Sequence, residues 1–112
     1  MAIHIFTKKP SDEQIVEMLL AHNDFIKLAV DISTQVIAGG GAYHADCEEL
    51  LLAQGSIQQN IWGGDWVPDK KGVLFGAMIN MRPSDGNRKY EIVDPALRKV
   101  FEGIVRSVFD PQ

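Results

Sequence analysis

A helix near the end of the chain is the feature that most constrains the fold. Asp94 is a favourable N-cap residue, and Pro95 suits the first helical position, where the missing N–H costs nothing. Behind them, six apolar residues recur at helical spacing: Leu97, Val100, Phe101, Ile104, Val105 and Val108. This continuous stripe must pack on another element, which predicts a layered structure.

Two further helices are predicted earlier in the chain. Ser11 followed by Gln14 has the form of a capping box, and the apolar residues behind it recur at helical spacing, so we expect a helix near residues 12–22. A short helix is expected near residues 46–54, with Asp46 as its N-cap.

The segments between the helices carry strand signals. Residues 25–32 alternate between apolar and polar side chains, and a polar turn joins them to residues 36–39, which predicts a hairpin. Apolar runs predict further strands at residues 3–6, 57–62 and 73–81.

We therefore expect one α+β domain over residues 1–112, built on an antiparallel sheet of about four strands. Two amphipathic helices should cover one face of this sheet, with the short helix near residues 46–54 in addition. The length of 112 residues, with 46% hydrophobic and 23% charged residues, is typical of a globular protein.

Charge and cysteine content narrow the classes of partner and location. A net charge of −4 and a pI near 5.2 give no basic field for nucleic acid or anionic lipid, so we expect neither as a partner. No apolar run approaches the roughly 18 residues of a membrane span, and charged residues interrupt residues 1–20 where a signal peptide would need an apolar core. Cys47 is the only cysteine, so we expect a reducing compartment, the cytoplasm.

The main candidate ligand site is the stretch Met78–Arg88, where an apolar run gives way to a polar loop. Asn80, Arg82, Asn87 and Arg88 carry forked donors that suit a phosphate or a carboxylate. Strand alternation would place Asn80 and Arg82 on one face. The alternative is a polar turn in which Arg82 pairs with a nearby acid and Asn87 adopts a left-handed conformation.

The preceding predicted strand adds Asn60 to this site. If the strands at residues 57–62 and 73–81 pair, Asn60 lies on the same polar sheet face as Asn80 and Arg82.

His44 and Asp46 are candidates for acid–base chemistry. Two residues apart, an imidazole and a carboxylate would share one face of a strand and could act together on a ligand. The competing interpretation is a helix-entry histidine beside a capping aspartate. No second histidine stands at ligand spacing, so no metal site is predicted, and the acidic neighbours of Cys47 disfavour a nucleophilic thiolate.

Trp62 and Trp66 flank two glycines and an aspartate. Their rings could stack on a ligand or anchor a protein partner, including a second copy of the chain. The alternative is a hairpin turn flanked by packing aromatics.

Five blocks of sequence cover much of the chain: Gly40–Asp46, Leu50–Ser56, Gln59–Gly63, Met78–Arg88 and Asp94–Arg98. Together they resemble a small bacterial and archaeal protein family classed as a domain of unknown function. The resemblance implies a single domain with a shared polar site, and it carries over no activity, substrate or catalytic residue.

The leading hypothesis is a protein that binds a small anionic ligand through this polar face and loop, with His44 as a candidate acid–base group. The alternative is an interaction module or homodimer that uses Trp62, Trp66 and the same polar surface. A concave pocket would favour the first hypothesis, and a flat patch ringed by the tryptophans would favour the second. The sequence identifies neither a reaction nor a cofactor.

Overall fold

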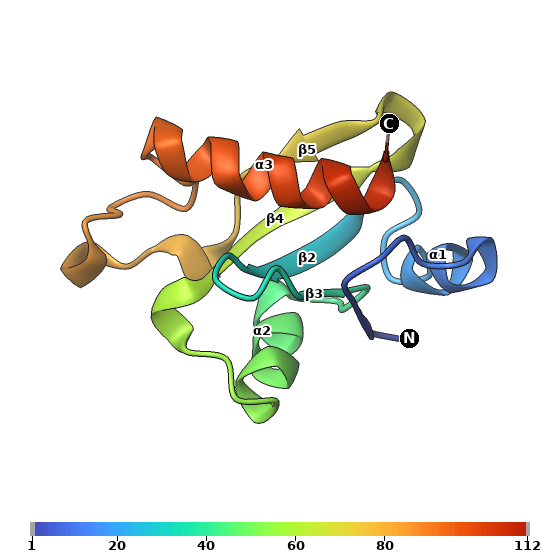
Figure 1. Cartoon of the computed structure of the whole chain (residues 1–112), viewed down its shortest axis with the longest axis horizontal. Helices are drawn as coiled ribbons and strands as arrows, with labels where there is room; N and C mark the ends of the chain where they lie inside the picture. Colours follow the sequence, from blue (N-terminus) through green and yellow to red (C-terminus); the bar gives the residue numbers. More distant parts are fainter. Residues whose placement is uncertain (1, 112) are drawn as a thin grey trace.

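An antiparallel sheet organises the structure. The computed structural model describes residues 2–111, in which the strands are β1 (His4–Phe6), β2 (Ile26–Asp31), β3 (Ile37–Gly39), β4 (Ile61–Val67) and β5 (Gly72–Leu74). They pair in the order β1-β3-β2-β4-β5, and every pair is antiparallel (Figure 1). The predicted α+β class is confirmed, with one strand more than expected.

The helices lie on both sides of this sheet. They are α1 (Asp12–Met18), α2 (His44–Ala53) and α3 (Pro95–Phe109). α3 crosses one face, α2 covers the other, and α1 lies at the side of the sheet (Figure 1). Met18 of α1 belongs to the core beneath α3. Within residues 2–111, no helix combines the length and apolar character that crossing a membrane requires.

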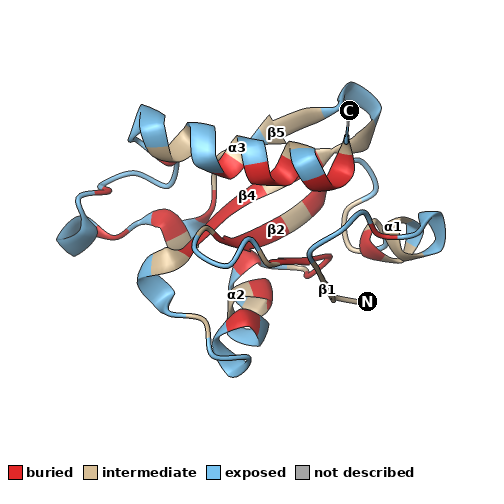
Figure 2. Cartoon of the chain, in the orientation of Figure 1, coloured by how far each residue is buried: buried red, intermediate tan, exposed pale blue. Residues whose placement is uncertain are grey.

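The larger core lies between α3 and the sheet. The buried side of α3 faces β2 and β4 (Figure 2). Its side chains pack on β2 and on both tryptophans of β4. Trp62 and Trp66 expose only 6% and 4% of their surface, and the ring centroids of Trp66 and Phe109 are 5.2 Å apart. These indoles are core residues and are not presented at the surface for a partner, which corrects the interpretation of Trp62 and Trp66 as interface anchors.

A smaller core joins α2 to the opposite face. Cys47 and Leu51 of α2 pack on Ala29 of β2, Ala38 of β3 and Ile61 of β4. The two alanines leave room for the helix to approach the sheet closely. α2 is thereby held directly over β2, with one helix end near each end of that strand.

The segment between residues 57 and 81 differs from the prediction. Residues 58–60 form a 3₁₀ turn, and β4 runs through the two tryptophans, so the predicted hairpin turn at Gly63 and Gly64 is wrong. Both glycines allow close approach: a Cβ at Gly63 would meet Ala77, and one at Gly64 would meet the carbonyl of Leu74. Their lack of a side chain serves packing inside the sheet.

The strand predicted over residues 73–81 is also shorter than expected. β5 ends at Leu74, and Met78–Asn80 form a 3₁₀ turn. Asn80 explains the difference, because its side-chain amide bonds to the N–H and the C=O of Gly63 on β4. One side chain thus replaces a strand as the partner of this part of β4.

The helix ends follow local capping. Ser11 and Gln14 form the predicted capping box of α1, which ends at Met18, four residues early. The side chain of Asp94 accepts a bond from the backbone N–H of Ala96 at the start of α3, as predicted. α2 begins at His44, so Asp46 lies inside the first turn.

Candidate functional site

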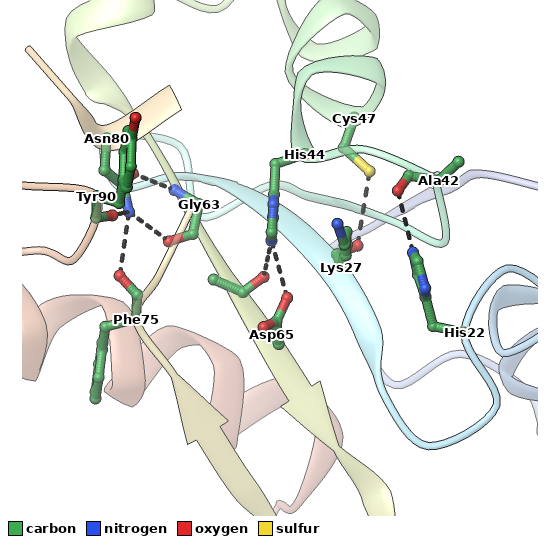
Figure 3. Close-up of polar contacts among 11 residues, drawn as sticks. His22, Lys27, Ala42, His44, Cys47, Gly63, Asp65, Phe75, Asn80 and Tyr90 are labelled. Atoms are coloured by element: carbon green, nitrogen blue, oxygen red, sulfur yellow. Dashed lines mark hydrogen bonds and ion pairs between the residues drawn. The ribbon is translucent and has the colours of Figure 1, made fainter. Parts of the chain in front are cut away.

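The two asparagines of the predicted ligand loop are fully engaged by the backbone. Asn80 is completely buried, and in addition to Gly63 its side-chain nitrogen donates to the carbonyls of Phe75 and Tyr90, both at 3.1 Å (Figure 3). Asn87 exposes 4% of its surface and bonds to four backbone groups, those of Asn80, Lys89, Glu91 and Val93. Both residues hold the irregular segment 75–93 in shape.

Arg82 is buried beside them. Its guanidinium stacks on the Trp62 ring at 3.8 Å, and Nη1 donates to the Gln58 carbonyl at 2.7 Å. Its Nε lies 3.5 Å from a carboxylate oxygen of Asp85. This is the pairing with a nearby acid that the polar-turn interpretation predicted. Burial lowers the pKa of Arg82, and the charges of Asp85 and Glu48 raise it in part.

The predicted site residues therefore do not converge on one pocket. Asn80, Arg82 and Asn87 lie inside the protein, whereas Arg88 is exposed. Asn60 is half-buried and lines a different pocket, near the turn between β2 and β3.

His44 lies at a more suitable position. It is in the first turn of α2, and its Nε2 is 2.8 Å from Oδ1 of Asp65 and 3.1 Å from the carbonyl of Gly64 (Figure 3). Both neighbours are acceptors, so Nε2 carries a proton. Nδ1 has no hydrogen-bond partner among residues 2–111 and, in the neutral ring, is the free acceptor.

The local backbone explains how His44 reaches this place. Gly40 has φ +104°, and a Cβ there would lie 2.5 Å from the carbonyl oxygen of Ala2, so the exit from β3 requires glycine. The ring of His22 then bonds to the carbonyl of Ala42 at 3.0 Å and holds the loop that enters α2 (Figure 3).

A groove of about 230 Å³ opens beside His44. It is lined by Lys27, Tyr43, His44, Ala45, Met78 and Ile79, and we call it the N-terminal groove because it lies at the N-terminus of α2. Lys27 is the cross-strand neighbour of Asp65, and its ammonium lies 5.8 Å from the centre of the Tyr43 ring. Tyr43 and Met78 expose 68% and 75% of their surface and form apolar walls at the mouth.

Electrostatics at the N-terminal groove favour a negative group. The N-terminus of α2 carries the positive end of the helix dipole, and Lys27 adds a full positive charge. Asp46 offsets part of the dipole and accepts the backbone N–H of Tyr43 at 3.3 Å, which makes it a capping residue inside the first turn. Asp65 is bound to His44.

Other chemistry at this end of α2 is disfavoured. Cys47 is fully buried, and burial raises the pKa of its thiol to about 11, so it is a poor nucleophile. In residues 2–111 no three His, Cys, Asp or Glu side chains are grouped to hold a metal ion.

Sequence reasoning missed the partner of His44. It paired the ring with Asp46, whereas the bonded carboxylate belongs to Asp65, 21 residues further along the chain. The available signal was the alternation of β2 and β4, which places Lys27 and Asp65 on the sheet face that α2 covers.

The chain was also compared with known proteins. The sequence model of one family, described as "Protein of unknown function (DUF5674)", matches residues 4–108, so the chain belongs to this family. No curated protein and no solved structure matches the chain.

Proposed function

We propose that this member of the DUF5674 family binds a small ligand with one anionic group and an apolar body in the N-terminal groove. Lys27 and the first turn of α2 bind the anionic group, while Tyr43, Met78 and Ile79 contact the body. This keeps the anionic ligand predicted from the sequence and moves its site toward the end of α2. A cytoplasmic location remains our expectation.

The observation that carries this proposal is the convergence of Lys27 and His44 on one apolar groove at a helix N-terminus. Ligand pockets in proteins commonly combine apolar walls with a few polar groups that fix orientation. The volume of about 230 Å³ suits a ligand of few heavy atoms.

His44 has the arrangement of an oriented acid–base group. Asp65 accepts the Nε2 proton and fixes the ring, which leaves Nδ1 to accept a proton or hydrogen bond from the ligand. We assign His44 the orienting contact to a polar group next to the anion.

The polar stretch Met78–Arg88 supports the wall of the N-terminal groove. Asn80 anchors the 3₁₀ turn that carries Met78 and Ile79, and Asn87 bonds to the carbonyl of Asn80 at 2.8 Å. In this proposal the asparagines shape the groove wall and do not touch the ligand.

Binding is tested with pairs of ligands that share a body and differ in charge. Benzoate against benzamide, and phenyl phosphate against phenol, should be compared by thermal shift and by amide chemical shifts in NMR. We expect only the anions to stabilise the protein in a saturable way and to shift the signals of residues 43–45.

Two lysine variants provide the matched control. Lys27→Met keeps a long side chain without its charge and should weaken benzoate binding about tenfold, since a charge-assisted contact contributes about 1.5 kcal/mol or more. Lys99→Met removes an exposed lysine from α3, on the opposite side of the sheet, and should leave binding unchanged. Equal loss in both variants, or equal binding of benzamide and benzoate, contradicts the proposal.

A further inference from the structure

A second pocket lies at the other end of α2. Its volume is about 240 Å³, and it is formed by the turn after β2 and by the segment that follows α2. Its lining combines hydroxyl and amide side chains, including Thr34, Ser56 and Asn60, with the carboxylate of Asp31, and no lining residue is basic. We call it the C-terminal pocket.

Asp31 is the most unusual member of this lining. It exposes only 1% of its surface. Oδ1 accepts the backbone N–H groups of Ser33 and Thr34 at 2.9 and 3.1 Å, and Oδ2 accepts the hydroxyl of Ser56 at 2.6 Å. Within residues 2–111 it forms no ion pair.

The carboxylate is held in its charged form. Burial raises the pKa of Asp31. The hydrogen bonds from Ser56, Thr34 and Ser33 together lower this pKa by more than burial raises it, so the folded pKa lies below the ordinary value. A buried carboxylate in this state is a fixed negative charge without a counter-ion from the described chain.

The helix adds to this charge. Gln54 and Gly55 follow the last turn of α2 and line the pocket, so the negative end of the helix dipole lies on the same side as Asp31. Two negative contributions next to hydroxyl and amide oxygens favour a positively charged hydrogen-bond donor.

We propose that the C-terminal pocket binds the ammonium group of a small organic cation, with Asp31 as its counter-ion and with Asn60 and the hydroxyl of Thr34 as further acceptors. An ammonium supplies three donors and a single charge, which matches one carboxylate surrounded by neutral oxygens. A divalent metal ion fits less well, because Asp31 is the one carboxylate that lines the pocket.

The test is an NMR titration of the whole chain with ethylammonium chloride, followed through the amide signals of Ser33, Thr34 and Ser56. We expect saturable shifts at these three amides. Potassium chloride at equal ionic strength, and ethanol as the neutral analogue, should not reproduce them. Shifts that potassium chloride reproduces, the absence of saturable shifts, or a response to magnesium chloride alone overturns the proposal.

Variants then assign the contact to Asp31. Asp31→Asn keeps acceptor oxygen and removes the charge, so ethylammonium affinity should fall about tenfold or more. Asp69→Asn removes an exposed carboxylate elsewhere and should leave affinity unchanged. Unchanged affinity in Asp31→Asn overturns the proposal.

A second pair of variants applies if Asp31→Asn does not fold. Thr34→Val and Asn60→Ala keep the carboxylate, and each removes one of the two neutral acceptors assigned to the ammonium group. Each should weaken ethylammonium binding about threefold, as expected for one neutral hydrogen bond. Unchanged affinity in both variants contradicts the site.

Discussion

The two ends of α2 have surroundings of opposite charge, although the helix is only ten residues long. At the N-terminus, the positive end of the helix dipole lies near Lys27; at the C-terminus, the negative end lies near Asp31. Both side chains come from β2, on the face that α2 covers, with Ala29 between them in the small core. At each end, the sheet adds a charge of the same sign as the helix end.

The two charges of β2 oppose the arrangement that would stabilise α2 best. A fold optimised for stability alone would place Asp near the N-terminus of a helix and Lys near its C-terminus. The opposite arrangement leaves each end in need of a counter-ion. At the N-terminus Asp65 and Asp46 meet part of that need, whereas Asp31 has only neutral donors.

The largest expected effect is a loss of stability that changes the structure only near the N-terminus of α2. Asn80→Ala leaves the backbone groups of Gly63 without partners and should lower the free energy of unfolding by about 2–4 kcal/mol in urea denaturation. Amide signals of residues 43–45 should shift, while those of Ser33 and Thr34 stay in place. Asn23→Ala, at an exposed position, is the control, and a loss no greater than in this control contradicts the role of Asn80.

An intermediate effect concerns the C-terminal end. Asp31→Asn should lower the free energy of unfolding by about 1–2 kcal/mol at pH 7, because the charge-assisted bonds of Asp31 are lost. The folded pKa lies below the ordinary 3.8, so the carboxylate stabilises the fold above that pH, and this contribution is lost as the pH falls through the folded pKa. Denaturation measured from pH 7 to pH 2 should show that the difference in free energy of unfolding between wild type and variant shrinks. A constant difference would contradict the stabilising role of the ionised carboxylate.

The smallest effect concerns the middle of α2. Burial raises the pKa of Glu48 above 4.5, and the charge of Arg82 offsets this in part, so the folded state favours the protonated acid. This contribution is present below the unfolded pKa and is lost as the pH rises through the folded pKa. Glu48→Gln should therefore raise the free energy of unfolding at pH 7 by less than about 1 kcal/mol, with no gain at pH 4.

The neighbouring residue supplies the control for that prediction. Glu49 is exposed on the same helix, and Glu49→Gln removes the same charge without relieving a buried carboxylate. Equal stabilisation by both variants would indicate a general charge effect of α2. Destabilisation by Glu48→Gln would show that its attraction to Arg82 outweighs the cost of burial.

Local signals predicted much of the fold. The capping box of Ser11 and Gln14, the polar turn after β2 and the start of α3 at Pro95 depend on residues close together in the chain. Side-chain chemistry and spacing are sufficient for such features.

The features that the sequence did not predict depend on contacts between segments far apart in the chain. Gly63 and Gly64 have the composition of a turn, and only the approach of Ala77 and Leu74 shows why they belong in a strand. Asn80 has the chemistry of a ligand residue, and its four backbone contacts come from three other segments. Asp65 is likewise joined to His44 only by the packing of α2 on the sheet.

The amide of Asn80 has a consequence for association between molecules. An open strand edge is a template on which another chain can add a strand and begin to aggregate. At Gly63 both edge groups of β4 are already occupied by a side chain of the same molecule. One asparagine thus occupies the two groups with which a further strand would pair at Gly63, and Asn80→Ala would leave both groups without a partner.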